Sequence, residues 1–167
     1  MRKSLILVVA MGIAGSAAAQ VPVMVNHNQQ ELLQSDDPAL AANKRVAYEF
    51  TRLVLRARDM DAARRLMAES YIQHNPTIAT GRASFINAFS RRPQSPALDT
   101  VEDLVTMVAE GDLVSLFFLR ECQDPRNPGQ TYTTTWFDMF RVENGLIAEH
   151  WDFGTIRGED NPPDCIR

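Results

Sequence analysis

The chain has 167 residues, a length that suits one domain and is short for two. Its 45% hydrophobic and 23% charged residues exclude a disordered or collagen-like chain. The net charge of -4 argues against a nucleic-acid-binding protein, because phosphate backbones require a concentrated positive surface. A compact, mildly acidic domain remains.

Residues 1–19 have the layout of a secretory signal peptide. Arg2 and Lys3 are positive, an apolar run over residues 5–13 follows, and the small residues 17–19 offer a cleavage site. An uncleaved anchor or a buried first strand is the alternative, but the run is shorter than the about 20 residues that a bilayer requires. We therefore expect cleavage before Gln20, a periplasmic or secreted protein, and no membrane association afterwards.

Export changes how the two cysteines are interpreted. Cys122 ends a strand-like run and Cys165 is the third residue from the C-terminus. In an oxidising compartment an even number of cysteines is typical of a disulfide, so we predict a Cys122–Cys165 bridge. Two unrelated thiols are the alternative. Neither cysteine has the spacing of a metal site.

The N-terminal half of the mature chain has helical patterning. Residues 20–35 are polar without a period and are expected to form a mobile arm ahead of a domain at 36–167. Asp37 and Pro38 then open an amphipathic helix that continues to Ala57. Asp59 is the expected N-cap of a shorter second helix, and a third begins at residue 81.

Strand patterning replaces helical patterning after residue 98. Residues 101–109 and 113–119 predict a hairpin, followed by strands at 131–142 and 146–153. Helices followed by a meander indicate an α+β fold, in which a curved antiparallel sheet wraps over about three N-terminal helices. Such a sheet encloses a cone-shaped central pocket.

Several sequence motifs together resemble one known family. They are Tyr-Ile-Gln-His-Asn-Pro at 71–76, Gly-Arg at 81–82, Gly-Asp-Leu-Val at 111–114 and the run at 137–152. From about Pro38 to Phe153 the chain resembles the SnoaL-like polyketide cyclases of the nuclear transport factor 2-like superfamily. The resemblance implies a pocket at the wide end of the cone and frequent dimers built through the sheet. Superfamily members include cyclases, isomerases, dehydratases and non-catalytic adaptors, so the resemblance implies fold more firmly than reaction.

The turn at 143–145 decides which side chains meet across the last hairpin. A two-residue loop would pair Met139 with His150, whereas a three-residue loop would pair Asp138 with His150 and Trp136 with Asp152. We favour the three-residue loop, with Gly145 in the left-handed conformation.

The favoured register gathers Asp138, His150 and Asp152 on one face and leaves Arg141 near Glu149 on the other. A carboxylate beside an imidazole suits proton transfer, and burial raises the pKa of a carboxyl toward working pH. We therefore expect Asp138 to be a general acid/base with His150 as its partner. The alternative is a solvent-facing ion pair on a wet sheet face.

Further residues are expected to bind substrate at the rim or wall of the pocket. For Asp152 the alternative is capping of the strand end, and for the segment 74–75 it is a local turn. The expected substrate-binding residues are Tyr71, His74, Asn75, Trp136, Phe140 and Asp152.

These features predict a cofactor-free acid/base enzyme that acts on a small apolar carbonyl compound by aldol-type cyclisation, isomerisation or a lyase step. The alternative is a non-catalytic ligand-binding or dimeric interaction module of the same fold. A metal held by His74, His150 and a carboxylate has no support from residue spacing, so no metal is expected. The expected partners are a small ligand or substrate and a second copy of the chain.

Overall fold

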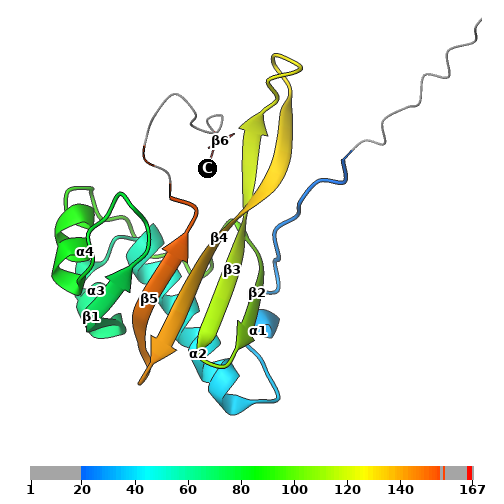
Figure 1. Cartoon of the computed structure of the whole chain (residues 1–167). Helices are drawn as coiled ribbons and strands as arrows, with labels where there is room; N and C mark the ends of the chain where they lie inside the picture. The colour runs from blue at the N-terminus through cyan, green and yellow to red at the C-terminus, as the bar shows by residue number, and fades with distance from the viewer. Residues whose placement is uncertain (1–19, 155, 157–164, 167) are drawn as a thin grey trace, which may run out of the picture.

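The computed structural model describes residues 20–154, 156 and 165–166, and for the last two residues the backbone alone. The predicted signal peptide and most of the C-terminal tail lie outside these residues. The α+β prediction is confirmed, with helices leading into a curved sheet (Figure 1). None of the described helices has the length and apolar character that crossing a bilayer requires.

The helical elements precede most of the sheet. They are α1 (Gln29–Leu32), α2 (Pro38–Glu49), η1 (Phe50–Arg56), α3 (Met60–Leu66) and α4 (Arg82–Phe89). The strands are β1 (Met67–Gln73), β2 (Leu104–Glu110), β3 (Leu113–Gln123), β4 (Thr131–Glu143), β5 (Leu146–Asp152) and β6 (Cys165–Ile166).

Both predicted helix caps are confirmed. The Asp37 carboxylate accepts a hydrogen bond from the Ala39 amide at 2.7 Å, and that of Asp59 accepts from the Ala62 amide at 2.9 Å. The predicted helix through Ala57 changes character midway, because α2 continues into the wider π-helix η1. Such widened turns are frequent at functional sites, and η1 carries side chains into the pocket described below.

The sheet has the order β1-β5-β4-β3-β2, with β6 pairing to β3 beyond the end of β2. The pairs among β2, β3, β4 and β5 are antiparallel, as predicted, but β1 runs parallel to β5. The sequence did not predict β1, because it follows α3 directly and its burial does not alternate regularly. This extra strand brings Gln73 beside His150 in register.

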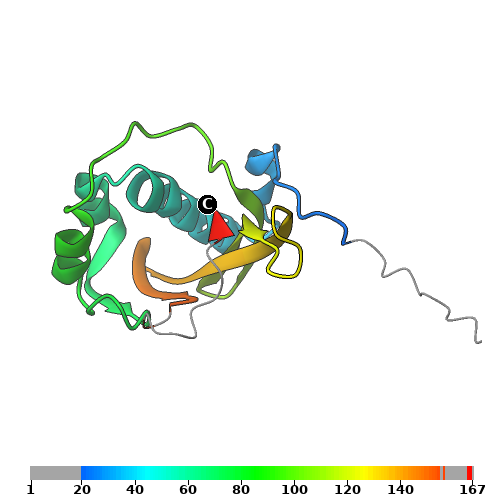
Figure 2. The same cartoon turned by 90° about the horizontal axis from the view of Figure 1, so that it is seen from above.

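The core fills the concave side of the sheet, where α2 and η1 lie across the strands (Figure 2). Phe50 at the start of η1 packs edge-on against Phe140 of β4, with ring centroids 5.3 Å apart, and lies 6.0 Å from Phe85 of α4. All three side chains are fully buried. The helix layer therefore fixes the strand face that carries Phe140 and Asp138.

The segment 20–35, expected as a mobile arm, follows the edge of the sheet. The Asn26 amide donates to the Leu104 carbonyl at 2.8 Å, and α1 places Gln29 in the core. Gln29 accepts from the Tyr48 hydroxyl and donates to the carbonyl of Val101. The packed part of the domain thus begins before residue 36.

The cysteine prediction is tested only through the backbone. Cys122 on β3 is fully buried, and β6 sets the backbone of Cys165 directly opposite it. This register is the one that a Cys122–Cys165 bridge requires. The side chain of Cys165 lies outside the described residues, so the bridge stays a prediction.

Candidate active site

The turn between β4 and β5 differs from the predicted one. Asn144 and Gly145 both have positive φ, 52° and 74°, and form a two-residue loop that pairs Glu143 with Leu146. The predicted three-residue loop is therefore wrong. A bulge then restores the expected faces, since Val142 pairs with Ile147 but Arg141 pairs with Glu149.

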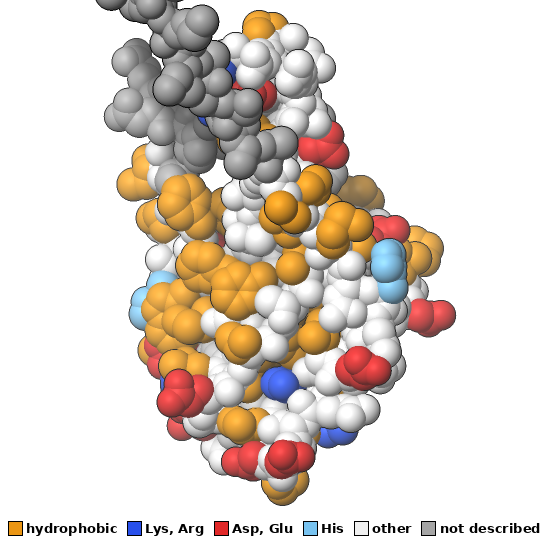
Figure 3. Space-filling model, turned by 90° about the vertical axis from the view of Figure 1, so that its right-hand side faces the viewer, with side chains coloured by type: hydrophobic (Ala, Val, Ile, Leu, Met, Phe, Trp, Pro, Cys, Tyr) orange, Lys and Arg blue, Asp and Glu red, His pale blue; other side chains and the backbone are white. Residues whose placement is uncertain are grey.

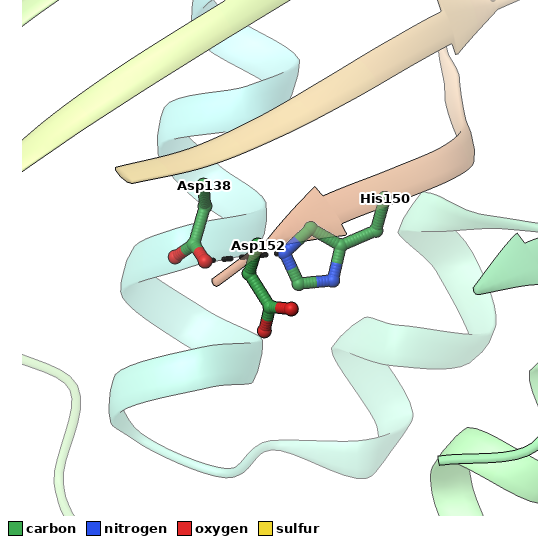
Figure 4. Close-up of side chains that lie close together, drawn as sticks. All are labelled: Asp138, His150 and Asp152. Carbon is green, nitrogen blue, oxygen red and sulfur yellow. Dashed lines mark hydrogen bonds and ion pairs between the residues drawn. The ribbon is translucent and has the colours of Figure 1, made fainter. Parts of the chain in front are cut away.

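Because of the bulge, Asp138, His150 and Asp152 share one face of the sheet, as expected (Figure 4). The pairing differs from the prediction, since Asp138 lies opposite Asp152 and His150 lies opposite Phe140. His150 Nε2 is 3.2 Å from Asp138 Oδ1, a diagonal contact between neighbouring positions. Asp138 and His150 are only 6% and 3% exposed, which excludes the solvent-facing ion pair.

Gln73 fixes the proton on His150. The backbone N–H of Asn75 can only donate, and it donates to Gln73 Oε1 at 3.2 Å. The NH₂ group of Gln73 therefore faces His150 Nδ1, at 3.4 Å, which makes Nδ1 an acceptor. In the neutral ring the proton then sits on Nε2 and is donated to Asp138 Oδ1. The ring of Phe140, stacked on His150 at 4.7 Å, holds its plane.

Asn75 holds the carboxyl group of Asp152 in place. Asn75 Nδ2 donates to both oxygens of Asp152, at 2.7 and 2.9 Å. Burial raises the pKa of Asp152, and the charge of Asp138 adds to the rise, while His150 and the Asn75 hydrogen bond act in the opposite direction. A carboxyl whose pKa is raised in this way is suited to act as a proton donor.

The hydroxyl of Tyr71 has no hydrogen-bond partner among the described residues, although the side chain is fully buried. Burial raises the pKa of Tyr71, and the charges of Asp152 and Asp138 raise it further. The phenol therefore keeps its proton next to two carboxyls. A buried donor without an acceptor costs stability, so this hydroxyl is a candidate for a role in binding.

The site residues face a cavity of about 120 Å³. Gln73, Asp138, His150 and Asp152 form its polar wall. The remaining lining residues are apolar or charged, and are Leu55, Arg56, Arg58, Ile78, Phe89, Arg92, Asp103, Phe118, Leu119, Arg120 and Trp136. The pocket is therefore more polar than the apolar-walled one that the sequence predicted.

The six predicted substrate-binding residues do not all line the cavity, and Tyr71 is fully buried outside its lining. Trp136 and Asp152 line the cavity, while Asn75 and Phe140 contact lining residues from behind. His74 does not reach the cavity, because its ring stacks on Trp151 at 4.4 Å and pairs with Glu149 at 2.9 Å. Arg141 also donates to Glu149, as expected for the opposite face.

Sequence reasoning missed Gln73 and the pocket arginines. The signal for Gln73 was its place in the 71–76 motif, two residues from Asn75. The arginines come from η1, the loops and β3, so only the folded arrangement brings them to one cavity.

Asp138, His150 and Asp152 are also the described residues that could ligate a cation, with ligand atoms within 4.8 Å of one another. A metal would take the Nε2 lone pair of His150, whereas Gln73 leaves the proton on that atom. The hydrogen bonds thus fit proton transfer better than cation binding.

Comparisons with known proteins assign the class. The profile of the SnoaL-like domain matches residues 47–150, more than half of the chain. The chain belongs to the SnoaL-like domain family, whose fold is that of the nuclear transport factor 2-like proteins. The family comprises small-molecule cyclases and isomerases. No curated protein matches the chain at a significant level.

The chain is similar to several solved structures, of which the first described here supports the fold. A proposed SnoaL-like polyketide cyclase from Jannaschia sp. CCS1 is 18% identical with a TM-score of 0.50, covering 72% of this chain and 90% of that one. TsrD from Streptomyces laurentii is 23% identical with a TM-score of 0.45, over 71% and 90% of the two chains. A proposed polyketide cyclase from Acidithiobacillus ferrooxidans is 17% identical with a TM-score of 0.49, over 72% and 90%.

Proposed function

We propose that the protein is a cofactor-free acid/base enzyme that moves a proton on a small carbonyl compound. One observation carries the proposal. Asp138 is buried, one of its oxygens accepts a hydrogen bond from His150, and its carboxyl lines the cavity beside a second carboxyl, Asp152. Buried carboxyls in a cleft that has a specific partner are candidates for catalysis.

In the proposed reaction, the Asp138 carboxylate removes a proton from the carbon next to the carbonyl group. His150 Nε2–H keeps the carboxylate oriented during this step. Asp152, whose pKa is raised, supplies a proton to the carbonyl oxygen as the enolate forms. Tyr71 is fully buried and does not line the cavity, so its proposed role is to stabilise the charge that Asp152 acquires when it gives up its proton.

Aldol-type cyclisation, isomerisation and a lyase step can all begin with this proton removal. They differ in what the enolate does next, which the rest of the substrate decides. We therefore propose the common first step and keep all three outcomes.

The proposal is tested by proton exchange in heavy water. A panel of simple aryl ketones is incubated with the purified protein, and deuterium uptake next to the carbonyl is followed by mass spectrometry. We expect uptake faster than the uncatalysed rate for at least one ketone, unchanged in the exposed control Asp61→Asn. Uptake at the uncatalysed rate across the panel, together with measurable ketone binding, would favour a non-catalytic binding module.

We also propose that the protein is exported and works as a homodimer built through the outer face of the sheet. The signal-peptide pattern at residues 1–19 supports export. Exposed hydrophobic side chains support assembly, since Phe137 and Val108 are 38% and 55% exposed on strands of the sheet. Figure 3 shows hydrophobic side chains gathered on one side of the molecule.

A further inference from the structure

The chain beyond the end of β5 folds back over the segment that follows β1. The two strands run parallel, with Gln73 opposite His150. Two residues further along each strand, Asn75 lies beside Asp152 and donates to its carboxylate. The chain then turns tightly, since the amide of Gly154 donates to the carbonyl of Asp152 at 3.0 Å. This turn brings Gly154 onto the side chain of Asn75.

An aromatic contact anchors the turn from its other side. Phe153, the central residue of the turn, packs edge-on against Trp136 of β4, with ring centroids 5.3 Å apart. Trp136 lines the pocket, so the turn is attached to the pocket wall. The position of Gly154 is therefore set by a backbone hydrogen bond and by the packing of the residue before it.

The amide group of Asn75 has one possible orientation, which Thr77 decides. Its Oδ1 accepts from the backbone N–H of Thr77 at 2.8 Å and from the hydroxyl of Thr77 at 2.6 Å. Because a backbone N–H can only donate, the oxygen of the amide must face Thr77. The NH₂ group then faces Asp152 and donates to both carboxylate oxygens.

Gly154 leaves the space that this amide group occupies. A Cβ atom added to Gly154 would overlap Cγ, Nδ2 and Oδ1 of Asn75. The backbone of Gly154 does not adopt the left-handed conformation that would itself favour glycine. Space, rather than backbone strain, therefore requires a glycine at this position. The overlapped atoms end a side chain, so in a larger variant they would move away from Asp152.

We propose that Gly154 is a positioning residue of the site, because its lack of a side chain lets the Asn75 amide hold the Asp152 carboxyl at the pocket. This role deepens the proposed function and rests on it for the proton that Asp152 supplies. Neither Gly154 nor Asn75 is among the described residues that line the cavity, so both act through Asp152 and not on the substrate. Asn75 thus has a positioning role in place of the substrate-binding role that the sequence predicted.

Gly154→Ala tests the role through the rate of deuterium exchange. The probe is the aryl ketone of the panel that the wild type exchanges fastest. We expect the rate at saturating ketone to fall by about tenfold or more, because a displaced Asp152 is misplaced for proton transfer. The affinity for the ketone should stay unchanged, since only the reaction step is affected. Exchange at the wild-type rate in folded Gly154→Ala would overturn the proposal.

Asn75→Ala provides a matched control, since it removes every atom that the added methyl group overlaps. Alone, it should slow exchange to a similar extent. Adding Gly154→Ala to Asn75→Ala should then have no further effect, because the two substitutions break the same contact. A further slowing in the double variant, as large as in Gly154→Ala alone, would show that Gly154 acts by another route and would overturn the proposal.

Gly129→Ala separates positioning from a general loss of stability. Gly129 lies in the loop between β3 and β4 and has a φ of 88°, while an added Cβ would meet no described atom within 4 Å. The substitution should therefore lower the melting temperature through backbone strain and leave exchange unchanged. Equal slowing in Gly129→Ala and Gly154→Ala would mean that exchange follows stability, which would overturn the proposal.

A measurement without turnover keeps this role separable from the proposed catalysis. In the wild type, the side-chain NH₂ protons of Asn75 should exchange slowly with water in NMR spectra, because a half-buried carboxylate binds them. In Gly154→Ala they should exchange like those of the exposed Asn87. The proton of His150 should stay on Nε2, because the backbone N–H of Asn75 still holds Gln73.

The two proposals fail separately in these experiments. Unchanged Asn75 signals in folded Gly154→Ala would overturn the positioning role, whatever the exchange rates are. The expected change in these signals, with no deuterium uptake by any ketone, would keep the hold of Asn75 on Asp152 and remove the proposed catalysis.

Discussion

Asp138 and Asp152 are direct cross-strand partners on β4 and β5, so two carboxyls line one side of the same pocket. Two carboxyls on directly paired residues of neighbouring strands disfavour simultaneous ionisation, because their negative charges repel. His150 donates to Asp138, and the pKa of Asp152 is raised mainly by its burial. Burial therefore makes Asp152 hold its proton more readily than an ordinary aspartate does.

The raised pKa of Asp152 predicts a pH-dependent stability. Below its unfolded value of about 3.9, both states are protonated and the contribution of Asp152 is fully present. As pH rises through the raised folded pKa, the folded protein must bury a charge and this contribution is lost. The free energy of unfolding of the wild type, relative to Asp152→Asn, should therefore fall as pH rises above about 4. Urea titrations of both proteins across that range measure it, and a pH-independent difference would contradict the assignment.

The lowered pKa of Glu149, on the outer face of the sheet, predicts a pH dependence of stability opposite to that of Asp152. Hydrogen bonds from His74 and Arg141, at 2.9 and 2.6 Å, lower the pKa of Glu149. Its contribution is present above the unfolded value of about 4.3 and is lost as pH falls through the lowered folded pKa. Glu149→Gln should cost about 1 kcal/mol or less at neutral pH, because His74 is partly exposed. This cost should vanish in acid, and a loss that persists at low pH would indicate packing instead.

The role of Gln73 is tested through the histidine ring. Nitrogen-15 shifts of neutral His150 should report a proton on Nε2 in the wild type, because Gln73 donates to Nδ1. Gln73→Leu removes that donor and should produce a mixture of tautomers. The exposed control Gln94→Leu should leave the shifts unchanged. A wild-type ring with its proton on Nδ1 would reverse the assignment.

Tyr71→Phe separates a binding role from a structural one. The hydroxyl has no partner among the described residues, so its removal should leave stability unchanged or raise it by up to about 1 kcal/mol. Deuterium exchange should nevertheless slow by about tenfold or more, because a buried donor that stabilises the Asp152 carboxylate formed in the reaction is lost. A marked loss of stability with unchanged exchange would make Tyr71 a structural residue.

Local sequence signals predicted much of the fold. The caps at Asp37 and Asp59 bond as expected, and β2 to β5 lie close to their predicted ranges. These features depend on residues near one another in the chain. β1 was missed because its pairing partner β5 is distant in sequence and its own pattern is irregular.

The sequence predicted which side chains of the candidate site share a face of the sheet. It did not predict which residues pair across β4 and β5. The bulge at Ala148 restored the face that the wrong turn would have lost. Its only sign in the sequence is a run of three consecutive apolar residues, Leu146, Ile147 and Ala148. Gln73, Arg58 and Arg120 could not be assigned, since three separate elements bring them to the cavity. Local patterns fix strand faces, whereas long-range pairing decides which side chains meet.

The most direct test of the proposed function is the deuterium exchange rate next to the carbonyl of an aryl ketone from the panel, with wild-type protein and with Asp138→Asn. The substitution preserves shape but removes the base, so exchange should fall by about 10²–10⁴-fold while the melting temperature and ligand affinity are retained. Exchange at the wild-type rate in folded Asp138→Asn would contradict the central claim that Asp138 transfers the proton.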